Sequence, residues 1–233
     1  MRTSIIERKT RETDITLTLN LDIAFPVDIE SNGNAMTAAK PLSAAIGGER
    51  CRGTCFHDNK TCNKNDSCEI STGIGFLDHM LTAFAVHGGF GLSLHCKGDL
   101  NVDSHHTAED VGIVLGKAFK SALGDVPIVR FGSSRIPMDE ALGWCDVDIS
   151  GRAFLVFDCE FASEKVGELD TQVVKEFMQA FAFNAGCTLH IGTLYGDNDH
   201  HKVEAMFKAL AYAMKCAVRL NSNNEILSTK GTL

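Results

Sequence analysis

The chain has 233 residues, a length that suits one large domain or two small ones whose core needs no disulfide bonds. It is 44% hydrophobic and 22% charged, which excludes wholesale disorder. The net charge of −8 argues against nucleic acid as a partner, because nucleic-acid binding needs a basic surface. No apolar run is long enough to span a membrane and the N-terminus has no signal region, so we expect a cytoplasmic protein with reduced cysteines.

The predicted elements begin with a strand over 14–25, where apolar and polar residues alternate strictly. Residues 27–70 are rich in Gly, Ser, Asn, Lys and Ala, so we interpret them as a long surface insert. A helix follows around Phe76–Phe84 and ends at Gly88-Gly89. Further along the chain, apolar spacing predicts strands over 90–96, 142–149, 153–161 and 187–193 and helices over 106–123, 171–184 and 201–218.

Four of the nine cysteines lie within the insert, at Cys51, Cys55, Cys62 and Cys68. Their C-x3-C-x6-C-x5-C spacing is only loosely similar to that of a zinc finger. We therefore favour a plain flexible insert and keep a zinc site as the alternative.

Two stretches of the chain resemble each other, DSHHTAEDVGIVLGKAF and NDHHKVEAMFKALAYAM. Each has a His pair, a Glu three residues beyond it and an amphipathic helix, and each follows a strand and a Gly-Asp turn. This self-similarity predicts an α+β fold made of a duplicated unit, a sheet with helices packed on one face. We assign the first half to 1–26 and 71–127, around the insert at 27–70, and the second half to 128–233.

The repeated stretches carry an H-H-x-x-E motif, at His105, His106 and Glu109 and again at His200, His201 and Glu204. At a helix start, the first His and the Glu are four residues apart and share a face, whereas the second His is rotated by about 100° and can serve another ion. Four His and two Glu without a thiolate suit Mn, Fe, Co or Zn better than Mg or Ca. The alternative interpretation is a pair of capped helix ends with solvated histidines. This alternative is much weaker because the motif occurs twice, in matching contexts.

The motifs TGIGFLDHML, DSHHTAEDVGIVLG, PMDEAL, VDISGR, TLHI and NDHHKVEAMFKALA together resemble those of the imidazoleglycerol-phosphate dehydratase family. The resemblance runs from Arg8 to the C-terminal STKG and omits only the insert. It implies a ribosomal protein S5 domain 2-like fold and a hydro-lyase of histidine biosynthesis that converts imidazoleglycerol phosphate into imidazole acetol phosphate. It further implies two Mn(II) ions per active site and a homo-oligomer of trimers assembled into a 24-mer.

The resemblance also implies roles for individual residues. The metal ligands would be six His and two Glu, namely His79, His105, His106, His190, His200, His201, Glu109 and Glu204. The catalytic residues would be Glu12, His79, His105, Glu109, His200 and Glu204, with Glu12 of the family's E-T motif also binding substrate and moving a proton. The other substrate-binding residues would be His87 and the phosphate-binding Arg130, Arg152, Lys208, Ser228, Thr229 and Lys230, the last three in a C-terminal tail.

The sequence departs from the family pattern at a few positions and allows two competing interpretations. Ser104 stands where the family often has an Asp, and Ala83 stands where a polar residue is common. His95 lies as far before its His pair as His190 does, but it falls on no family motif and is interpreted as an ordinary strand residue. A dinuclear metallohydrolase of a phosphorylated small molecule is the alternative enzyme. A metal sensor or store is a third possibility, which has no use for Glu12, Arg130 and Lys230.

Overall fold

The computed structural model describes residues 1–22 and 68–221. They form two four-stranded sheets, ordered β1-β2-β4-β3 and β5-β6-β10-β7, and one small hairpin. The first half contains β1 (Thr3–Lys9), β2 (Thr13–Asn20), β3 (Cys68–Ser71), α1 (Gly75–Gly88), β4 (Gly91–Gly98) and α2 (His105–Leu123). The second half contains β5 (Phe131–Met138), β6 (Ala141–Asp148), β7 (Phe154–Asp158), β8 (Lys165–Val166), β9 (Leu169–Asp170), α3 (Gln172–Ala185), β10 (Thr188–Tyr195) and α4 (Asp199–Ala217).

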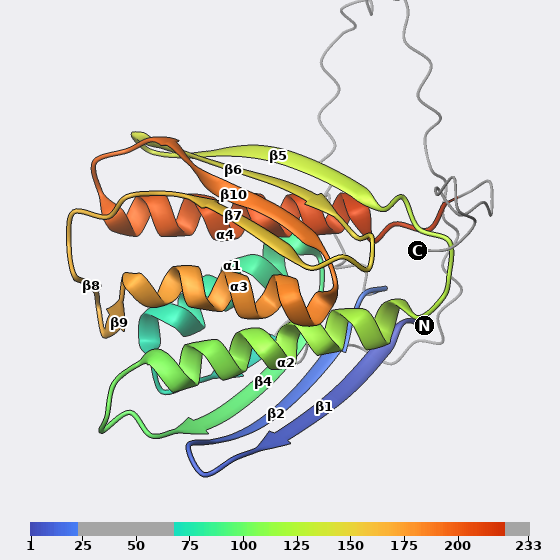
Figure 1. Cartoon of the computed structure of the whole chain (residues 1–233), viewed down its shortest axis with the longest axis horizontal. Helices are drawn as coiled ribbons and strands as arrows, with labels where there is room; N and C mark the ends of the chain where they lie inside the picture. Colours follow the sequence, from blue (N-terminus) through green and yellow to red (C-terminus); the bar gives the residue numbers. More distant parts are fainter. Residues whose placement is uncertain (23–67, 222–233) are drawn as a thin grey trace, which may run out of the picture.

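The four helices form the middle of the molecule and the two sheets lie outside them (Figure 1). In each sheet the first two strands and the long central strand pair antiparallel, and the remaining edge strand pairs parallel with that central strand. Between the halves, α1 packs against α4 and α2 packs against α3. This confirms the predicted α+β fold, in which a sheet-and-helix unit occurs twice.

The core lies where the helices meet the sheets and one another. The apolar stripe predicted for α2, including Val111, Leu115 and Phe119, is fully buried. A Cβ on Gly116 would lie 2.5 Å from the backbone oxygen of Phe181, so this position needs glycine for α2 and α3 to pack this closely. Helix α2, which begins at the first H-H-x-x-E motif, is therefore held in place by dense packing as well as by its own propensity.

Two predicted boundaries need correction. The strand predicted over 14–25 ends at Asn20, and residues 23–25 lie outside the described part of the chain. Residues 68–70, predicted as the end of the insert, form β3 with Ser71 and pair with β4. Cys68 packs against the core from this strand, so it is a sheet residue. The other three cysteines of the possible zinc site lie outside the described residues, as does the tail with Ser228, Thr229 and Lys230.

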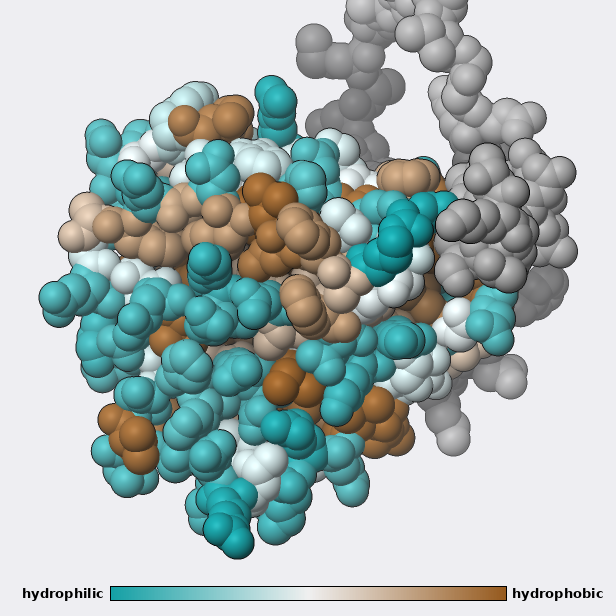
Figure 2. Space-filling model, in the orientation of Figure 1, coloured by the Kyte–Doolittle hydropathy of each residue, from teal (hydrophilic) through white to brown (hydrophobic). Residues whose placement is uncertain are grey.

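The surface differs between the two halves in Figure 2: an apolar band crosses the upper part of the view over β7, and the lower part over α2 is mainly hydrophilic. Phe131 and Phe154 are exposed at the start of β5 and β7 in the second sheet. None of the helices in the described ranges is long and apolar enough to cross a membrane.

Candidate metal centre

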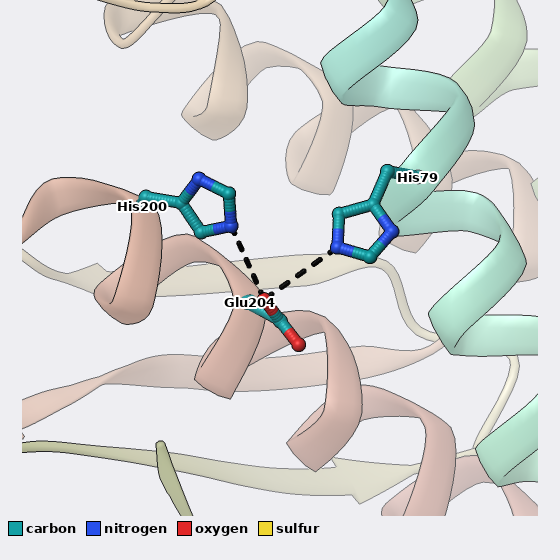
Figure 3. Close-up of side chains that lie close together, drawn as sticks. All are labelled: His79, His200 and Glu204. Carbon is teal, nitrogen blue, oxygen red and sulfur yellow. Dashed lines mark ion pairs between the residues drawn. The ribbon is translucent and has the colours of Figure 1, made fainter. Parts of the chain in front are cut away.

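One group of potential metal ligands forms where α1 meets α4. It consists of His79 from α1 and of His200 and Glu204 from the first turns of α4 (Figure 3). The Glu204 carboxylate lies 3.3 Å from Nε2 of His200 and 3.6 Å from Nε2 of His79. His200 and Glu204 share a face of α4, as their spacing predicts, and the packing of α1 on α4 adds the third ligand.

Local hydrogen bonds hold the helix starts that carry these side chains. The Asn198 side chain accepts hydrogen bonds from the backbone N–H groups of His200 and His201, at 2.9 and 3.4 Å. At α1, the Asp78 carboxylate accepts bonds from the Thr72 amide at 2.8 Å and its hydroxyl at 2.6 Å. The Asn198 cap satisfies orphan donors at the start of α4, and the bonds from Thr72 tie the segment before α1 to its first turn, so both ligand-bearing turns are held in place.

Glu204 is an ionised carboxylate in a mostly buried position, with 9% of its side chain exposed. Burial by itself would raise its pKa, but the hydrogen bond and charge of Lys208, at 2.6 Å, and the neighbouring His79 outweigh that effect and lower the pKa below its usual value. The lowered pKa keeps the oxygens deprotonated, which is the form that binds a metal ion.

The second H-H-x-x-E motif opens α2. Nε2 of His105 lies 3.6 Å from the Glu109 carboxylate, so these two also share a helix face. His106 is rotated away, with its ring 83° from that of His105, and Nδ1 lies 3.0 Å from Asp99. Its Nε2 lies 4.0 Å from Glu12. Glu12 and Asp99 line a cavity of about 280 Å³ beside the β1–β2 turn.

His201 in α4 has the same arrangement as His106 in α2. Its ring is turned 80° from that of His200, and Nδ1 lies 2.6 Å from Glu140 in the β5–β6 turn. The hydrogen bond from His201, followed by backbone N–H donors, lowers the pKa of Glu140 to about 2. In turn, the hydrogen bond to Glu140 raises the pKa of His201, and the bond to Asp99 raises that of His106.

One connection, residues 159–171 between β7 and α3, ties the two motifs together. At α4, Asp199 accepts hydrogen bonds from the amides of Ala162 and Ser163, at 3.0 and 2.7 Å. At α2, the Ser104 hydroxyl donates to Asp170 at 2.8 Å. Ser104 occupies the position in the first motif that Asp199 occupies in the second. At α4 the motif supplies the carboxylate and the connection supplies the donors, whereas at α2 the motif supplies the hydroxyl and the connection supplies the carboxylate of Asp170.

The structure does not bring His190 to the other predicted ligands. Leu189 and Ile191 point into the core beneath the helices, so His190 between them points to the opposite face of β10. There it lines a cavity of about 410 Å³ together with Asp146 and Asp148. His95 has the equivalent place on β4, near Glu69 at 3.8 Å, as expected for an ordinary strand residue.

The predicted phosphate-binding residues lie in two separate places. Lys208 contacts Glu204, and His87, two turns beyond His79 on α1, packs against Tyr212 of α4. Burial, followed by the charge of Lys208, lowers the pKa of His87. The two arginines lie at the other end of the second sheet: Arg130 forms a bidentate pair with Asp148, and the largely exposed Arg152 lies 3.6 Å from the same carboxylate.

Three acidic residues of this region were missed by reasoning from the motifs alone. Asp99 and Glu140 contact the rotated histidines, and Glu176 is the fifth residue of α3, as His79 is of α1. The duplication was the available signal, because it makes α3 the counterpart of α1. Since α2 packs on α3 as α4 packs on α1, half-buried Glu176 corresponds to the third ligand of the group in Figure 3.

Comparisons with known proteins agree on one family. The family model for imidazoleglycerol-phosphate dehydratase matches residues 72–214. The protein of that name from Methanosarcina barkeri is 48% identical over 234 residues, covering all of both chains. The one from Clostridium botulinum is 57% identical over 167 residues, covering 71% of this chain and 85% of its own.

Solved structures give the same result. Imidazoleglycerol-phosphate dehydratase from Staphylococcus aureus has a TM-score of 0.70 and 31% identity, covering 94% of this chain and 99% of its own. The enzyme from Pyrococcus furiosus, solved in complex with (S)-C348, has a TM-score of 0.71 and 31% identity, covering 98% and 100%. The chain therefore belongs to the imidazoleglycerol-phosphate dehydratase family, metal-dependent hydro-lyases of histidine biosynthesis that act on a phosphorylated imidazole.

Proposed function

We propose that this chain dehydrates imidazoleglycerol phosphate at a centre of two Mn(II) ions. The observation that carries the proposal is the group of His79, His200 and Glu204, whose ligand atoms all lie within 4.8 Å of one another. Ligand atoms about 2.1 Å from one ion lie about 3–4 Å apart. The Glu204 carboxylate already lies 3.3 Å from His200 and 3.6 Å from His79, so small side-chain movements would let one ion bind all three. Imidazole nitrogens with a carboxylate are a donor set that Mn(II) accepts.

The second ion would use His105 and Glu109 as the counterpart of His200 and Glu204. The rotated His106 and His201 would each bind the ion that is held by the other motif. In each case that other motif would belong to another subunit. Glu176 is our candidate for the remaining ligand, in place of His190. The support is its position in α3, equivalent to that of His79 in α1, and the outward direction of His190.

Glu176→Ala is expected to remove one of the two Mn(II) ions per chain, because it deletes a direct ligand. His190→Ala is expected to leave both ions bound, because its side chain faces away from the helices that carry the motifs. Metal content by elemental analysis after gel filtration distinguishes the two variants. If the Glu176 variant keeps both ions and the His190 variant loses one, His190 is a ligand, as predicted from the sequence, and Glu176 is not.

The substrate site would be shared between subunits. Glu140 at the β5–β6 turn marks the metal end of the second sheet, and Asp148 with Arg130 marks the other end of β6. The eight residue steps from Glu140 to Asp148 separate these ends by about 26 Å, which a small phosphorylated substrate cannot span. Phosphate binding by Arg130 and Arg152 would therefore need a second chain, in line with trimers assembled into a 24-mer.

Within this site the hydroxyl on the carbon next to the imidazole ring would leave as water, and Glu12 would take the proton from the adjacent carbon. The resulting enol would become the ketone of the product by gaining a proton at the carbon next to the ring. Bound metal ions would supply positive charge beside the imidazole ring, which makes its ring proton easier to lose. Lys208 would face the phosphate side while holding Glu204 ionised.

The six free cysteines in the described part of the chain accord with a cytoplasmic location.

The direct test is to incubate the purified full chain with imidazoleglycerol phosphate, after chelation and again after addition of Mn(II). We expect a ketone product that retains its phosphate, formed only with metal present. Release of inorganic phosphate would instead indicate the metallohydrolase alternative. Full turnover by thoroughly demetallated protein would disprove the metal centre.

A further inference from the structure

Both carboxylate oxygens of Glu140, which contacts His201, have partners in the segment that begins α4. One oxygen, Oε1, accepts hydrogen bonds from the backbone N–H groups of Asp197 and Asn198, at 3.2 and 2.8 Å. The other, Oε2, lies 2.6 Å from Nδ1 of His201. The carboxylate is therefore held by the segment that caps α4, with its second oxygen aimed at the imidazole ring.

We propose that Glu140 is a positioning residue that sets the tautomer of His201 for metal binding. An ionised carboxylate only accepts hydrogen bonds, so Nδ1 of His201 must carry the proton. The lone pair then lies on Nε2, which is the nitrogen left to bind an ion and which lies 3.6 Å from the exposed carboxylate of Asp139. Partners of this kind orient metal-binding histidines and raise their basicity. The inference rests on the proposed function, because it takes His201 to be a ligand.

The first half of the chain uses the same device with a different residue. Asp99, which lies just after β4, accepts from Nδ1 of His106 at 3.0 Å. The hairpin turn of that half carries Glu12 at the place equivalent to Glu140, but Glu12 lies 4.0 Å from Nε2 of His106. The duplicated turns have therefore diverged: one carries the proposed proton carrier and the other orients a ligand.

Glu140→Gln is a sharp test because its amide keeps the shape of the carboxylate. The two backbone N–H groups are donors, so they hold the amide oxygen and turn its NH₂ toward Nδ1 of His201. That contact favours the proton on Nε2 and so weakens metal binding through this nitrogen, although the fold is unchanged. We expect Mn(II) to bind about 10–100-fold more weakly at one of the two sites. Equilibrium dialysis of the full chain against Mn(II) measures both affinities.

The matched control is Glu168→Gln, an exposed glutamate in the β8–β9 turn, which should bind both ions as the wild type does. Unchanged affinities in Glu140→Gln would overturn the inference. Loss of both ions, or a lower melting temperature of the metal-free protein than in the control, would also overturn it by giving Glu140 a purely structural role. A wild type that binds no Mn(II) would instead disprove the proposed function, so the two failures are distinguishable.

Discussion

Replacing Glu12 with Gln is expected to lower kcat by about 10²–10⁴-fold while both metal ions stay bound, because a general acid–base group typically contributes this much. The Glu12 carboxylate lies 4.0 Å from Nε2 of His106, and 53% of the side chain is exposed, so it reaches both the metal region and solvent. The amide has the same shape but cannot take a proton. Steady-state kinetics and metal content measured on the same preparation separate these effects.

The backbone around Glu12 is held firmly, so the substitution should not disturb it. The Thr10 hydroxyl accepts hydrogen bonds from the amides of Glu12 and Thr13, at 3.1 and 2.9 Å. Thr13 in turn donates to buried Asp110, which also pairs with Arg8 at 2.8 Å. Glu7→Gln on β1 of the same hairpin is the control and should keep full activity. A near-wild-type rate in the Glu12 variant would mean that another group moves the proton.

The central strands and the helices could be predicted from the sequence, but several edge strands could not. Strands β2, β4, β6 and β10 each have neighbours on both sides, and their alternation is strong enough to read directly. Strands β1, β3 and β5 are sheet edges with polar sequences such as TSIIERK and FGSSRIPM. Their pairing depends on the neighbouring strand, which is tertiary information that local pattern does not contain.

The part of the metal site that lies within one helix could be predicted from the sequence, but the part that depends on contacts between distant helices could not. The i, i+4 spacing correctly placed His200 beside Glu204 and His105 beside Glu109. The approach of His79 depends on α1 packing against α4, more than 100 residues away, so spacing could not reveal it. The outward direction of His190 was readable, because its strand neighbours are apolar on both sides and strand side chains alternate.

Replacing Glu204 with Gln is expected to remove the ion held with His79 and His200 and to reduce kcat by more than the ~10–100-fold typical of supporting residues. Its carboxylate faces both histidines and Lys208, so it is the only anion of this group in the described residues. Glu109→Gln should remove the other ion. Metal content near one ion per chain in each variant, measured by elemental analysis, would support two separate sites. Two ions in either variant would contradict the ligand assignment.

Glu204→Gln also leaves the mostly buried Lys208 ammonium without its carboxylate partner. A loss of metal or activity in this variant could therefore come from the unpaired charge as well as from the missing ligand. A second change resolves this. Lys208→Met in the Glu204→Gln background removes the unpaired charge while keeping the length of the side chain, so it should recover the melting temperature of the metal-free protein. It should not recover the ion, because the carboxylate ligand is still missing. Return of metal binding in the double variant would show that Glu204 acts by neutralising Lys208 and is not itself a ligand.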